Sequence, residues 1–199
     1  MIKVLSYILV FLGIWIFFFK DTTVEYGPGV LAPNEPLQTD IDSSKTFIFN
    51  GERVTPLANF ELQAKVLSKE EYSHDRGALH SPVDLALGWG RMSDESVISH
   101  LDITQSGRWY RWKTEKFPIP RKEIETSSAN MHMIPQNAVI ASILEDVREG
   151  DIISLKGKLV RIDADDGGHW QSSLSRTDTG NGACELIFVE EIRIENIIN

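Results

Sequence analysis

The sequence predicts a mainly β protein with one amphipathic helix, folded as a small OB-like or SH3-like barrel behind an N-terminal transmembrane helix. Three observations lead to this fold class: an unbroken apolar run at residues 4–19, strand-like alternation in several later segments, and one stretch with helical periodicity. A chain of 199 residues suits one domain with a tail. We therefore expect an anchor at residues 1–20, a flexible tether at 21–45 and a β-barrel-like soluble domain at 46–199.

The apolar run at residues 4–19 predicts a signal anchor. At about 1.5 Å per residue these residues would span roughly 24 Å as a helix, slightly less than a bilayer core, and Lys3 and Lys20 flank them. A cleaved signal peptide is the alternative, but no small-residue cleavage site follows Phe19. The amino terminus and Lys3 favour a cytoplasmic start. We therefore expect a single-pass protein of the bacterial inner membrane that contacts lipid through residues 4–19 and carries its C-terminal domain in the periplasm.

Residues 21–67 and 101–112 differ from one another in proline content and in the pattern of their apolar residues. Residues 21–45 contain Pro28, Pro33 and Pro36 without sustained periodicity, which is typical of a partly extended tether. Residues 46–54 predict a small hairpin, because Asn-Gly at 50–51 provides the positive φ angles of a tight turn. Residues 60–67 alternate as a strand does, and residues 101–112 predict two strands joined by a turn at Ser-Gly.

The C-terminal half contains the helix and the closing strands. Apolar residues recur at helical spacing from Val139 to Val147, and Gly150 is a suitable residue for the helix end. Residues 151–162 alternate, with an apparent change of phase near Gly157 that predicts a bulge and a sharp bend there. Residues 163–183 are expected to form a polar loop and residues 186–194 a closing strand. Helix followed by a bent strand resembles the corresponding passage of an OB-fold.

Composition excludes several classes of protein. With 42% hydrophobic and 25% charged residues, the chain is neither wholly disordered nor collagen-like, and it is not a polytopic membrane protein. Its formal net charge of −9 disfavours nucleic acid as a partner. A single cysteine, Cys184, cannot form an internal disulfide.

Three phrases of the sequence resemble a group of small, membrane-anchored, uncharacterised bacterial proteins. They are SPVDLALGWG at residues 81–90, SANMHMIP at 128–135 and GACE at 182–185. The resemblance covers most of residues 54–190. Because this group has no assigned activity, the resemblance implies a membrane-anchored domain and transfers no role to any residue.

Aromatic and arginine residues are the first candidate site. A barrel face of this kind binds ligands by stacking and cation–π contacts. The alternative is that the rings cover the barrel core and the arginines cover the rings. The candidate ligand-binding residues are Trp89, Arg108, Trp109, Tyr110, Arg111, Trp112 and Trp170.

Cys184 is the second candidate. A catalytic cysteine needs a histidine that withdraws its proton, and His132 and His169 are the candidate bases. The alternative is that Cys184 packs as a small apolar residue.

The third candidate is a metal site. Met131, His132 and Met133 could bind copper(I), since thioether sulfur and imidazole suit this ion. The alternative is that the two methionines fill gaps in the packing. The five histidines show none of the usual metal-binding spacings.

These observations favour a binding or assembly module over an enzyme. The expected partner is a membrane or periplasmic protein, and we expect no cofactor and no nucleic acid. Two alternatives stay open: a Cys184-dependent hydrolase or transferase, and a copper-handling protein that uses Met131, His132 and Met133.

Overall fold

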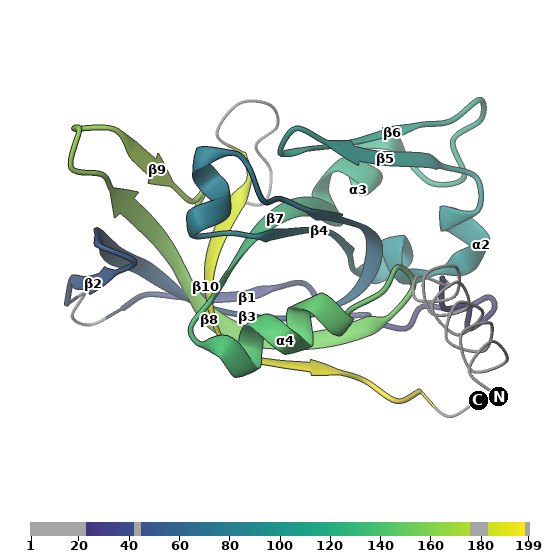
Figure 1. The fold of residues 1–199 in the computed structure, drawn as a ribbon. Coiled ribbons are helices and arrows are strands. Elements are labelled where there is room, and N and C mark those ends of the chain that lie inside the picture. Colours follow the sequence, from purple (N-terminus) through teal and green to yellow (C-terminus); the bar gives the residue numbers. More distant parts are fainter. Residues whose placement is uncertain (1–22, 42–44, 176–182, 198–199) are drawn as a thin grey trace, which may run out of the picture.

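The computed structural model describes residues 23–41, 45–175 and 183–197 and is mainly β (Figure 1). Its strands are β1 (Leu37–Thr39), β2 (Phe47–Phe49), β3 (Glu52–Glu71), β4 (Val83–Gly88), β5 (Asp102–Ser106), β6 (Trp109–Lys113), β7 (Ser128–Pro135), β8 (Ile152–Asp163), β9 (His169–Gln171) and β10 (Glu185–Ile194). The α-helices of these residues are α2 (Glu95–Ile98), α3 (Arg121–Thr126) and α4 (Ala138–Asp146). Two 3₁₀ helices, η1 (Arg76–Leu79) and η2 (Gly90–Ser93), flank β4.

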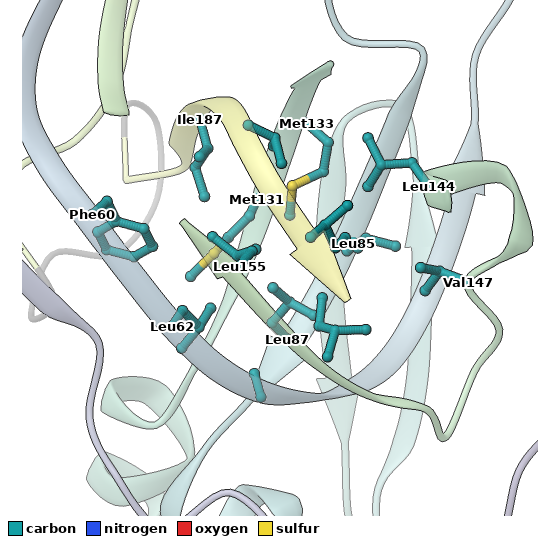
Figure 2. Packing of buried hydrophobic residues seen from close by; sticks show 14 of the residues in the cluster. Phe60, Leu62, Leu85, Leu87, Met131, Met133, Leu144, Val147, Leu155 and Ile187 are labelled. Atoms are coloured by element: carbon teal, nitrogen blue, oxygen red, sulfur yellow. The ribbon is translucent and has the colours of Figure 1, made fainter. Parts of the chain in front are cut away.

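Five of the strands pair in a closed ring. β3 pairs with β4, β4 with β7, β7 with β10, β10 with β8, and β8 returns to β3. The β7–β10 pair is parallel and the other four pairs are antiparallel. The inward-facing side chains form the main apolar core, and Figure 2 shows Phe60, Met131 and Leu155 among them. Such a ring leaves no exposed strand edge of its own.

The 20-residue strand β3 makes this closure possible. It pairs with β8 along its first part and with β4 along its last part, and its register shifts between Pro56 and Ala58 and again between Val66 and Ser68. Such irregularities increase the local bend of a strand. The predicted alternation is confirmed, since Phe60, Leu62, Ala64 and Val66 all lie in the core.

The predicted change of phase at Gly157 is wrong. Leu155 and Leu159 both face the core on either side of Gly157, so β8 keeps one phase. The outward-facing Val160 and Ile162 are also buried, because a second apolar cluster covers that face. The bulge near this point lies on the partner strand, where the β10 register shifts between Val189 and Glu191.

The helix α4 connects β7 to β8. The side chain of Asn137 caps its first turn by accepting hydrogen bonds from the backbone N–H groups of Val139 and Ile140. Ile140 and Leu144 are buried on the predicted face, whereas Val139 is 69% exposed, which differs from the expectation. Gly150 follows with a φ of +88°.

The predicted fold class is wrong as stated. A five-stranded ring with a helix between its third and fourth strands has the strand number of an OB-type barrel, but the described residues contain three short α-helices in place of one. No helix of the described residues is long and apolar enough to cross a bilayer. The expected anchor at residues 1–20 lies outside the described residues.

The described part of the expected tether contacts the barrel. The N–H group of Gly29 donates to the side chain of Asp94, and the N–H groups of Leu31 and Ala32 donate to the hydroxyl of buried Ser93. Ala32 is itself fully buried. Residues 29–32 are therefore held against the segment that joins β4 to β5.

Candidate functional site

A separate two-stranded hairpin lies against the barrel. β5 and β6 pair only with each other among the described strands, and Figure 1 shows them on the far side of the barrel from α4. The hairpin packs through Ile103, Tyr110 and Trp112 onto a cluster that includes Leu67 of β3 and Ala86 of β4. Its turn has Gly107 and Arg108 at φ angles of +57° and +70°.

Arg108 ties this turn to the barrel. Its guanidinium donates two hydrogen bonds to Asp75, one of 2.7 Å to Asp84 and one of 2.9 Å to the carbonyl oxygen of Ser81. The same group lies 3.7 Å above the centre of the Tyr72 ring. Burial lowers the pKa of Arg108, but the bonds to Asp75 and Asp84 outweigh this effect and the net shift is upward.

A buried histidine lies beside this cluster. Asp84 and His132 are cross-strand neighbours on β4 and β7, and the Nδ1 atom of His132 lies 2.9 Å from a carboxylate oxygen of Asp84. Asp84 is fully buried and His132 is 3% exposed. The ring of Trp170 covers the imidazole, with 4.8 Å between the two ring centres. One buried carboxylate thus faces both an arginine and a histidine.

The space between the hairpin and the barrel is a groove of about 700 Å³, which we call the β6 groove. Consecutive residues from Trp109 to Thr114 line it, so the groove follows the strand edge of β6 as well as one of its faces. The remaining lining comes from Trp89, Phe117, Arg121, Glu125, Ser128–Asn130, Ser175 and Ala183–Glu185. Trp109 and Phe117 are 37% and 49% exposed, which is unusual for rings of this size.

The cations of the β6 groove differ in how they are paired. Arg121 forms an ion pair of 2.8 Å with Glu125 on α3. Arg111 donates only a 3.4 Å hydrogen bond to the Ser106 hydroxyl, and Lys113 lies 3.9 Å from Asp102. Arg111 and Lys113 therefore present nearly uncompensated positive charge within a chain of net charge −9.

A second cavity of about 1020 Å³ adjoins the β6 groove, and we call it the His132 cavity. Trp109, Ser175 and Cys184 line both spaces. The second cavity is further lined by Arg108, His132, His169, Trp170, Gln171, Ser172, Ser173 and Leu174. The two spaces meet where the hairpin turn approaches the start of β10.

The structure divides the predicted aromatic site. Trp109, Tyr110, Arg111 and Trp112 line the β6 groove together with Trp89, whose side chain belongs mainly to the barrel core. Burial raises the pKa of Tyr110 to about 12, and its hydroxyl donates to Ser128. Arg108 and Trp170 line the His132 cavity instead.

The structure separates the three predicted copper ligands. Met131 and Met133 are fully buried in the barrel core, while His132 between them belongs to the opposite face of β7 and contacts Trp170. Figure 2 shows both thioethers among core side chains. Within residues 23–41, 45–175 and 183–197, no group of three or more His, Cys, Asp or Glu side chains is arranged to hold a metal ion.

The predicted cysteine and both candidate histidines do come together, since Cys184, His132 and His169 line the same cavity. Sequence reasoning missed Asp84 and Asp75 as site residues, because neither lies at a spacing that is typical of a catalytic or metal-binding motif. It also missed Phe117, which lies between two lysine- and proline-containing stretches. A signal for Asp84 was present, since a charged residue inside an apolar strand needs a buried partner.

No protein-family model matches the chain, and neither a curated protein nor a solved structure matches it. What the protein does must therefore be inferred from its own residues.

Proposed function

We propose that the protein is a binding module that holds an extended, acidic segment of a partner polypeptide in the β6 groove. The observation that carries this proposal is the continuous run from Trp109 to Thr114 along the groove, in a strand whose only partner among the described strands is β5. An unpaired strand edge can accept the backbone of an added strand.

Side chains of the groove would select the partner. Added strands present alternate side chains to the surface that receives them. Trp109 and Phe117 offer exposed apolar surface. Arg111 offers positive charge without an ion-pair partner among the described residues, and Lys113 has only an exposed 3.9 Å contact with Asp102. A segment that alternates apolar and acidic residues fits both features. In keeping with the apolar run at residues 4–19, we propose a membrane or periplasmic protein as the source of this segment.

Reversing the two groove charges tests this proposal. We expect Arg111→Glu/Lys113→Glu to lower recovery of the partner about tenfold or more in a crosslinked affinity purification from the native membrane, because like charges repel across an interface. Recovery should also fall with added salt for the wild-type protein.

The matched control is Lys122→Glu/Lys156→Glu, which changes the net charge equally. Neither lysine lines the groove, and the exposed contact of Lys156 with Glu61 contributes little to stability. Circular dichroism establishes that both variants fold. Equal partner recovery by the two double variants would contradict the proposed site.

A further inference from the structure

The single cysteine of the sequence lies in a chemically distinctive place. Cys184 is partly buried and lines the His132 cavity as well as one end of the lining of the β6 groove. His132 lines the same cavity, is 3% exposed, and neither of its ring nitrogens forms a hydrogen bond with the described residues. A buried imidazole without a hydrogen-bond partner on the wall of a cavity is a second, independent feature of this site.

The carboxylate of Asp84 influences which ring nitrogen of His132 carries the proton. An oxygen of this carboxylate lies 2.9 Å from Nδ1 of His132 without the alignment of a hydrogen bond, and its negative charge favours the tautomer that carries the proton on Nδ1. The Nε2 lone pair is then the one that faces the cavity. Asp84 is itself held by the Arg108 guanidinium at 2.7 Å, and Trp170 restrains the imidazole from one side. This arrangement fixes a base in one orientation.

Strand pairing brings Cys184 near this base. β7 and β10 are parallel with Leu186 opposite His132, and Cys184 precedes Leu186 by two residues. Strand spacing and rise place the α-carbons of Cys184 and His132 about 8 Å apart, a separation that two side chains can bridge. Hydrogen bonds fix the backbone here: the Ser173 N–H donates to the Cys184 carbonyl oxygen, and the Leu186 N–H donates to the Ser172 hydroxyl.

The lining of the cavity is compatible with a thiolate. The described residues that line it include neither Asp nor Glu, whose charges would repel an ionised sulfur. Asp84 and Asp75 contact Arg108 directly and compensate its charge. His132 is therefore the group that takes the thiol proton and then forms an ion pair with the thiolate.

We propose that Cys184 is a nucleophile for acyl transfer from an ester or thioester, with His132 as its base and Asp84 as the positioning residue. The Cys184 thiol gives its proton to Nε2 of His132, and Sγ forms a bond to the acyl carbon. The bond to the leaving alkoxide or thiolate breaks, and that group takes the proton from His132. Water then attacks the thioester formed on Cys184, and His132 accepts a proton from this water. The bond between Sγ and the acyl carbon breaks, His132 returns the proton to Sγ, and the carboxylic acid leaves.

Alkylation by iodoacetamide tests the first step, because the full-length chain contains one cysteine. We expect wild-type Cys184 to react at pH 7 about tenfold faster than Cys184 in His132→Gln, because an imidazole that accepts the thiol proton increases the fraction of reactive thiolate. His169→Gln, which changes the other histidine of the cavity, should react like the wild type. With p-nitrophenyl acetate we expect one acetyl group per chain to be taken up in a burst that Cys184→Ser lacks.

The pH profile of wild-type alkylation keeps the test decisive if His132→Gln fails to fold. A midpoint at or above that of a free thiol, about pH 8.5, would overturn the proposal, as would equal reactivity in His132→Gln. Alkylation and acetyl uptake are measured on the protein without a partner. A negative result in these two assays therefore does not contradict the proposed partner site in the β6 groove. A negative result for partner binding likewise does not contradict the proposed thiol site.

Discussion

Replacing Arg108 by methionine should lower the free energy of unfolding by roughly 3–5 kcal/mol, because the change leaves the buried carboxylate of Asp84 without its cation. Asp84 is fully buried, and its Arg108 contact of 2.7 Å is the only one it makes with an arginine or lysine among the described residues. The methionine keeps an unbranched side chain over Tyr72, so the loss of apolar contact is small. Urea unfolding followed by circular dichroism measures the change.

Arg111→Met is the matched control on the same hairpin. Arg111 is exposed and makes one long hydrogen bond, so its replacement should change stability by less than about 0.5 kcal/mol. In Arg108→Met/Asp84→Asn the uncompensated charge is absent, and the double variant should lose less than the sum of its single variants. If Arg108→Met costs no more than Arg111→Met, the Arg108 contacts do not hold the hairpin on the barrel.

Gly157→Ala should cost about 3 kcal/mol or more, the upper range for an overpacked core. A Cβ atom at this position would lie 2.1 Å from the carbonyl oxygen of Phe188 and 3.2 Å from the α-carbon of Val189. β8 pairs with β3 on one side and β10 on the other, so it cannot move away from either. The midpoint of thermal unfolding gives the measurement.

Gly168→Ala provides the comparison for this substitution. Its added Cβ would meet the flexible side-chain oxygen of Asp166 at 3.1 Å in an exposed turn, which can shift at little cost. We expect this variant to unfold near the wild-type temperature. Similar losses in both variants would mean that the close approach of β8 and β10 at Gly157 does not restrict the side chain there.

Local patterns in the sequence predict much of the fold. Asn50 and Gly51 form the predicted turn with positive φ angles, and the alternation from Phe60 to Val66 marks a core strand. The helix before Gly150 is likewise confirmed. These features depend on neighbouring residues and on one buried face, which a sequence shows directly.

Contacts between distant segments were harder to predict. The apolar residues on both faces of β8 suggested a change of phase, whereas two separate clusters bury the two faces. The cluster of Arg108, Asp75 and Asp84 joins three segments, and no spacing rule connects them. The sequence placed Trp109 and Cys184 in separate candidate sites, and the start of β10 brings both to adjoining cavities.

The central claim is that the β6 groove holds a partner polypeptide. The most direct measurement introduces a photocrosslinking benzoylphenylalanine at position 117 in the groove, or at position 48, and irradiates intact cells that express the full-length protein. Phe117 and Ile48 are both exposed apolar residues, at 49% and 67%, but Ile48 lies on β2 and does not line the groove. We predict a crosslinked partner from position 117 that is absent from position 48. Crosslinking from position 48 alone, or equal crosslinking from both positions, would contradict the account.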